Sequence, residues 1–122
     1  MTQLALPVSV PLEEVARKKS FGAAIAMTYE LADLEPKEVI DRIKCDKAHL
    51  SRWESGGEGI TYTKLSALMD ACGNDAPVLW MLHQRGYDLA SVRRRESELE
   101  RRLRLAEEEV VALKRVLMGR PL

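Results

Sequence analysis

The chain has 122 residues, which leaves room for one small domain and a short appendage, because domains cluster near roughly 100 to 150 residues. Its hydrophobic fraction of 46% and charged fraction of 31% exclude an intrinsically disordered chain. The net charge is zero, but residues 1–90 hold ten Lys and Arg against thirteen Asp and Glu, whereas residues 91–122 hold nine against six. The overall charge therefore argues neither for nor against a nucleic-acid partner.

The apolar runs of the sequence are all short. None approaches the roughly 18 residues of a membrane span, and the amino terminus lacks the basic start and long apolar centre of a secretory signal. We therefore expect a cytoplasmic protein with no membrane partner. Alternating β-type residues extend nowhere beyond about five positions, so the predicted fold class is all-α.

Capping residues and prolines mark the predicted helices in chain order. Residues 1–19 are predicted to form an amino-terminal arm, in which a helix could start near Leu12. Ser20 is placed to cap a first core helix, and Pro36 fits the first turn of a second, where its missing N–H costs nothing. Asp46 fits the N-cap of a third helix, which a Ser-Gly-Gly sequence closes.

Two further helices complete the predicted domain. Thr61 is placed to cap a fourth helix that ends at Gly73, and Asn74 or Asp75 to cap a fifth that is apolar on nearly all sides. A helix of that kind is expected deep in a core or at an interface. Residues 20–90 are therefore predicted to form a five-helix domain.

The second and third predicted helices are separated only by residues 44–46, and the third carries Leu50 and Trp53 inward, which is the helix-turn-helix arrangement. The stretch VIDRIKCDKAHLSRWESG resembles the lambda-repressor-like (Xre/Cro) helix-turn-helix superfamily. Its segment CDKAHLSRWE is similar to the corresponding part of phage CII-type transcriptional regulators. The resemblance covers about residues 20–73.

This resemblance implies a transcriptional regulator of phage or prophage type that binds double-stranded operator or promoter DNA in a sequence-specific way. It also implies a carboxy-terminal oligomerising helix, and RNA polymerase is a further candidate partner. The sequence departs from the family pattern at two positions. Lys44 stands where the turn usually has Gly, so we expect a strained or altered turn conformation there, and Pro36 replaces a Gln that often contacts DNA.

The third predicted helix carries the candidate base-reading surface. Arg and Lys match the O6 and N7 acceptors of guanine, Ala contacts the thymine methyl, and Ser or His bonds to a base or a phosphate. The candidate base contacts are Lys47, Ala48, His49, Ser51 and Arg52. The resemblance places Lys47, Ala48 and Arg52 at base-facing positions, whereas His49 stays open between a base reader and an exposed bystander.

Phosphate contacts are predicted around this surface. Basic side chains concentrate in the helix-turn-helix, and the amides at the starts of the second and fourth helices resemble anion-binding helix termini. The candidate phosphate contacts are Lys37, Lys44, Thr61 and Thr63. Glu58 is among the acidic residues expected to lie outside this basic surface.

The tail has a coiled-coil pattern. Its apolar residues recur at a spacing of seven and then alternately four and three, so residues 91–122 are predicted to form a coiled-coil oligomerisation helix that joins two or four subunits. The heptad positions are Val92, Leu99, Leu103, Ala106, Val110, Leu113 and Leu117. A parallel pair aligns opposite charges, namely Arg95 with Glu100, Arg102 with Glu107, and Glu109 with Lys114.

Two other classes of function are open to a chain of this kind. A protein-interaction module, such as an antirepressor or adaptor, would use the fourth and fifth predicted helices and the coiled coil. An enzyme is disfavoured because His49 and His83 lie on different helices, and the sequence shows no catalytic, metal or cofactor motif. Cys45 and Cys72 lack metal-ligand spacing and are expected to be reduced and buried.

Overall fold

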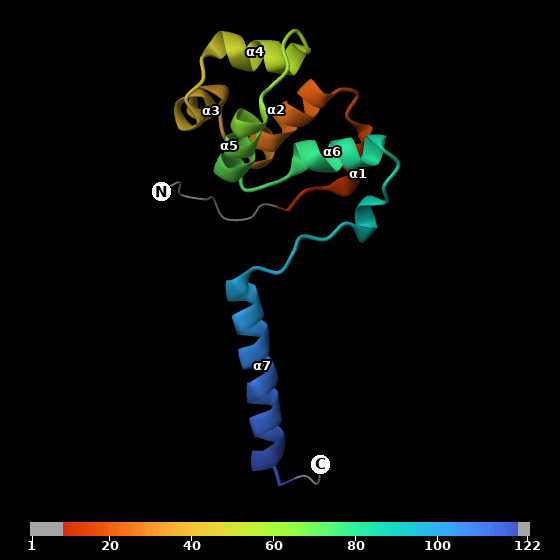
Figure 1. Cartoon of the computed structure of the whole chain (residues 1–122), viewed down its shortest axis with the longest axis vertical. Coiled ribbons are helices and arrows are strands. Elements are labelled where there is room, and N and C mark those ends of the chain that lie inside the picture. The colour runs from red at the N-terminus through yellow and green to blue at the C-terminus, as the bar shows by residue number, and fades with distance from the viewer. Residues whose placement is uncertain (1–8, 120–122) are drawn as a thin grey trace. The chain divides into compact units, whose positions relative to one another are not determined.

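The computed structural model describes residues 9–119, and every regular element in that range is helical, which confirms the all-α prediction. The chain divides into two compact units, Met1–Val92 and Arg93–Leu122 (Figure 1). The first unit contains α1 (Leu12–Arg17), α2 (Phe21–Leu31), α3 (Pro36–Ile43), α4 (Lys47–Ser55), α5 (Tyr62–Cys72), α6 (Ala76–Gln84) and the 3₁₀ helix η1 (Leu89–Ser91). The second contains α7 (Glu98–Leu117).

The predicted helix starts are confirmed by side-chain caps. Ser20 Oγ accepts a hydrogen bond from the Ala23 amide at 3.1 Å, and Asp46 Oδ1 accepts one from the His49 amide at 2.7 Å. Thr61 Oγ1 accepts one from the Lys64 amide at 3.3 Å. Each bond satisfies an amide that the first helical turn leaves without a backbone partner, so the local sequence alone defines where α2, α4 and α5 begin.

The core of the first unit has two parts that share α2. The larger cluster gathers side chains from α2, α3, α4 and α5, and the smaller one gathers side chains from α1, α2, the start of α6 and η1. Val15 of α1 is fully buried in the smaller cluster. The predicted helix start near Leu12 is confirmed, but residues 12–17 pack into the folded core and do not extend from it as an arm; residues 1–8 of the predicted arm lie outside the described range.

Buried polar groups connect α2 with the start of α6. The Asn74 side chain donates to the Thr28 carbonyl at 3.0 Å, and its Oδ1 accepts from the Ala76 amide at 3.2 Å. Of the two candidate caps for this helix, Asn74 thus supplies this side-chain bond, although Asp75 occupies the N-cap position. Farther along α6, Trp80 Nε1 donates to the Lys18 carbonyl at 2.8 Å and anchors the α1–α2 connection.

Helices α2 and α4 cross at very short range. A Cβ atom placed on Gly22 would lie 1.9 Å from the Glu54 carbonyl oxygen, so only glycine fits at this crossing. Beside it, the Tyr29 hydroxyl donates a hydrogen bond to the Glu54 carboxylate, and burial together with this bond raises the pKa of Tyr29. The crossing with α2 is therefore one of the contacts that position α4 on the unit.

Helix α7 begins later than the heptad pattern predicts. Ser97 Oγ accepts from the Glu100 amide at 3.1 Å and caps the helix, whereas residues 92–97 are not helical. The Val92 amide instead donates to the Leu89 carbonyl at 3.2 Å and closes η1. The assignment of Val92 and Arg95 to a coiled-coil helix is therefore wrong, and the helical heptads start at Leu99.

No helix within residues 9–119 is both long enough and apolar enough to cross a membrane.

Candidate nucleic-acid interface

The turn between α3 and α4 is stabilised by a contact from α5. Lys44 has φ 55° and ψ 53°, the left-handed conformation that glycine adopts most readily, so of the two expectations for this turn the structure has the strained one. The Lys64 ammonium donates to the Ile43 carbonyl at 2.7 Å and to the Lys44 carbonyl at 2.9 Å. These carbonyls end α3 and lack helical partners, so Lys64 replaces the bonds that the helix loses there.

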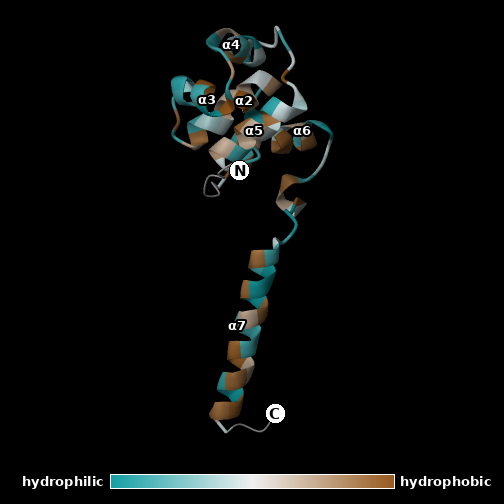
Figure 2. Cartoon of the chain, turned by 60° about the vertical axis from the view of Figure 1, so that its left-hand side comes forward, coloured by the Kyte–Doolittle hydropathy of each residue, from teal (hydrophilic) through white to brown (hydrophobic). Residues whose placement is uncertain are grey.

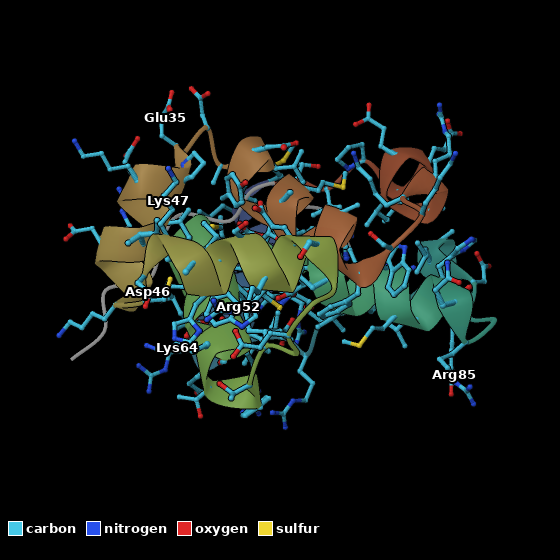
Figure 3. The ribbon with its side chains drawn as sticks, turned by 90° about the horizontal axis from the view of Figure 1, so that it is seen from above. Glu35, Asp46, Lys47, Arg52, Lys64 and Arg85 are labelled. Carbon is cyan, nitrogen blue, oxygen red and sulfur yellow. The ribbon has the colours of Figure 1, made fainter. Side chains whose placement is uncertain are left out.

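Helix α4 presents a polar face to solvent. Leu50 and Trp53 are 2% and 6% exposed, which confirms that they face the core. At 3.6 residues per turn, Ala48 and Ser51 occupy the middle of the opposite face, and Lys47 and Arg52 lie along its two edges (Figure 3). The term "α4 face" below means Lys47, Ala48, Ser51 and Arg52, all of which are exposed.

Glu58 folds back onto α4, contrary to the expectation that it lies outside the basic surface. Its Oε2 accepts from Arg52 Nε at 3.3 Å and lies 3.0 Å from His49 Nδ1. The hydrogen bond with His49, followed by that with Arg52, holds the pKa of the Glu58 carboxyl below its ordinary value. The glycines around Glu58 have no side chains to obstruct this return, and the carboxylate partly offsets the positive charge of Arg52.

His49 is part of this cluster. Its ring stacks on Trp53, with centroids 5.9 Å apart and an interplanar angle of 25°. Its Nδ1 also lies 3.1 Å from Arg52 Nη2. Because Nδ1 donates when protonated and accepts when not, it bonds to Glu58 or to Arg52 according to the tautomer. No local sequence signal predicts this cluster, since Glu58 lies in the loop beyond the helix.

The two predicted phosphate-binding helix starts differ in charge. At α3, the Glu38 carboxylate accepts from the Glu35 amide at 3.3 Å, so two acids surround the exposed Lys37 and disfavour an anion there. At α5, the cap is the neutral Thr61 and the first turn has no acidic residue. Thr61 and Thr63 are exposed, as is Lys44 at the turn. The phosphate prediction is therefore favoured at α5 and weakened at α3.

The apolar face of α7 is exposed along its whole length. The heptad residues within the helix are Leu99, Leu103, Ala106, Val110, Leu113 and Leu117, and α7 has no buried residue. Figure 2 shows hydrophobic and hydrophilic residues alternating along the helix. Such an amphipathic helix with an uncovered apolar stripe is typical of an oligomerisation element.

The remaining candidate chemistry is modest. Cys72 is buried, and burial raises the pKa of its thiol to about 11, whereas Cys45 is only half-buried, which corrects the expectation of full burial. Both cysteines are free thiols. Within residues 9–119, no three His, Cys, Asp or Glu side chains are grouped so that they could hold a metal ion.

Comparison with models of known protein families, with curated proteins and with solved structures finds no match to this chain. The function is therefore inferred from the geometry above and from the sequence resemblance.

Proposed function

We propose that the protein is a sequence-specific, double-stranded DNA-binding transcriptional regulator that acts as a dimer or tetramer. In this proposal, α3 and α4 form a helix-turn-helix, the α4 face enters the major groove, and α7 joins the subunits as a coiled coil. The phage or prophage type follows from the CII-like resemblance alone. Such a regulator works in the cytoplasm at operator or promoter DNA, with RNA polymerase as the neighbour it excludes or recruits.

The observation that carries this proposal is the orientation of α4. Its apolar side chains are buried and its start is capped by Asp46, while the outward face offers two cations, a hydroxyl and a methyl group. This set matches the donors, acceptors and methyl groups that the major groove displays. Lys64 and the left-handed Lys44 hold the turn that sets the direction of α4.

Selection of bound fragments from genomic DNA tests the proposal and supplies the site for the next experiment. Arg52→Ala should then lower discrimination at one base position by about 1 to 3 kcal/mol without unfolding the protein. Arg85→Ala is the matched control, because Arg85 lies at the end of α6, away from α4 (Figure 3). Equal binding of selected and random DNA by the unmodified protein would exclude the proposal.

A protein-interaction module is the second candidate, and exposed apolar side chains favour it. Tyr62 on α5 and Met81 on α6 are large and exposed, as is Tyr87 beyond α6. Side chains of this kind are enriched in protein interfaces. The two functions differ in one measurement, because only a DNA-binding protein forms a complex with selected DNA that weakens steeply as salt increases.

A further inference from the structure

The proposed DNA-binding unit is short of positive charge. Residues 1–90 carry three more acids than bases, and Glu58 offsets Arg52 on the α4 face itself. Affinity for DNA depends largely on cations that neutralise phosphates and release counterions. A regulator built this way needs basic residues from elsewhere in the chain.

The segment that follows this unit has the required charge. Arg93, Arg94 and Arg95 are consecutive, exposed and outside any helix. Residues 91–122 hold nine bases against six acids, so without these three arginines the tail would be neutral. The coiled-coil prediction assigns Arg95 to an interhelical contact, but the start of α7 at Glu98 removes it from that role.

The acidic residue that directly follows these arginines in the sequence forms an ion pair with α7. Glu96 Oε2 accepts from Arg104 Nε at 2.9 Å, and its Oε1 accepts from Arg104 Nη2 at 3.2 Å. This pair holds the pKa of Glu96 below its ordinary value. Within residues 9–119, neither Arg93 nor Arg95 forms an ion pair. Their charges are therefore available to an anionic partner.

We propose that Arg93, Arg94 and Arg95 bind phosphates of the same DNA, along the stretch between two half-sites. This inference rests on the proposed function. In a dimer that is joined through α7 and bound to two half-sites, the α7 helices lie on the two-fold axis between the half-sites. The segment of each chain must therefore run from its own half-site to that axis. Half-sites about one turn apart have centres roughly 34 to 36 Å apart, and six extended residues such as 92–97 reach about 20 Å, so the span fits.

The test replaces the three arginines in the full chain and measures how affinity for the selected DNA depends on salt. R93Q/R94Q/R95Q, called the linker variant below, should make the negative slope of log affinity against log salt shallower. The expected change is roughly 0.9 for each phosphate that is no longer neutralised, about 3 to 5 in a dimer. R85Q/R101Q/R115Q removes the same charge from the end of α6 and from outward positions of α7, and it should keep most of the original slope. Sedimentation should give the same oligomer for all three proteins.

Two additional measurements define the interaction. R93K/R94K/R95K should restore the slope, because phosphate binding requires charge and no particular base-reading geometry. Hydroxyl-radical footprinting should show that the unmodified protein protects the DNA backbone between the half-sites, and this protection should be absent with R93Q/R94Q/R95Q.

Each adverse result has a distinct meaning. If the unmodified protein binds selected DNA and the linker variant matches the control variant, the phosphate contact is refuted while the proposed function stands. A linker variant that keeps its DNA slope but no longer binds RNA polymerase would assign the arginines to an acidic protein surface and also refute the contact. If the unmodified protein shows no preference for any DNA, both proposals fall.

Discussion

The two units of this chain use the same apolar residue types in opposite ways. In the first unit, side chains such as Leu68 are completely buried, and two clusters of the same chain supply the burial. In α7, Leu117 is 84% exposed and no residue is buried. The first unit therefore contains what it needs for stability, whereas α7 has an apolar stripe that only another surface can cover.

The charges beside that stripe favour a second copy of α7 in parallel orientation. A parallel pair retains two attractive contacts per chain, Arg102 with Glu107 and Glu109 with Lys114. An antiparallel pair that sets Leu103 against Leu113 would oppose each Glu107 and each Glu109 to its own copy. The later start of α7 removes the Arg95 contact but leaves this preference intact.

The largest expected effect comes from disrupting the apolar stripe of α7, which tests whether this helix needs a second copy. L103D/V110D places charges on the predicted seam and should give a monomer by sedimentation, while affinity for a two-half-site DNA falls by roughly two to four orders of magnitude because avidity is removed. L105D/V111D adds the same charges away from the seam and should leave the oligomer unchanged. Equal behaviour of the two variants would place the interface elsewhere.

A smaller effect tests the self-contained core. Trp53→Ala should lower the free energy of unfolding by about 3 to 5 kcal/mol, because it removes a buried aromatic ring beneath α4. Tyr62→Ala truncates a ring that is 80% exposed and should change stability by no more than about 0.5 kcal/mol. Denaturant unfolding of both variants measures the difference, and an unchanged midpoint for the Trp53 variant would contradict the orientation of α4.

The buried bond between α2 and α6 should have an intermediate effect. Asn74→Ala removes the partner of the Thr28 carbonyl and of the Ala76 amide, and should cost about 1 to 3 kcal/mol of unfolding free energy. Gln84→Ala, at the exposed end of α6, serves as the control in the same unfolding experiment. A cost no larger than the control's would mean that water replaces both bonds.

The smallest expected effect concerns the Glu58 carboxyl. Its titration followed by NMR should give a pKa below the ordinary value of a glutamate, and His49→Ala should move that pKa upward because the first hydrogen bond is removed. Since the folded-state pKa is depressed, the stability that this carboxylate contributes is present at neutral pH and is lost as pH falls through the lowered pKa. An unchanged titration in the His49 variant would assign the shift to Arg52.

Features that depend on neighbouring residues could be predicted from the sequence. The caps at Ser20, Asp46 and Thr61 and the burial of Leu50 and Trp53 follow from short-range chemistry and helical spacing, and the structure has them in place. The start of α7 was missed for a local reason. The heptad pattern extends back to Val92, but the Val92 amide closes η1 and Ser97 caps α7, so the helix starts only after Ser97.

Contacts outside the regular spacing of a helix could not be predicted in this way. Glu58 reaches Arg52 across a glycine-rich loop, and Lys64 reaches the end of α3 from 20 and 21 positions away. Neither contact has a periodic or capping signature, because the first depends on the path of the loop after α4 and the second on how α5 packs against the end of α3. The candidate base contacts were thus identified from the sequence, whereas the carboxylate that orients one of them required the structure.

Gly22 gives the protein a vulnerable position that a map of DNA contacts would not reveal. Any side chain there meets the backbone of α4 at the crossing with α2, so α4 must shift even if the rest of the core accommodates the change. Under the proposed function, a genetic selection for stable protein that no longer controls a reporter should return substitutions of Gly22. In these mutants α4 would be displaced and could no longer fit the major groove, although every side chain proposed to contact bases would still be present.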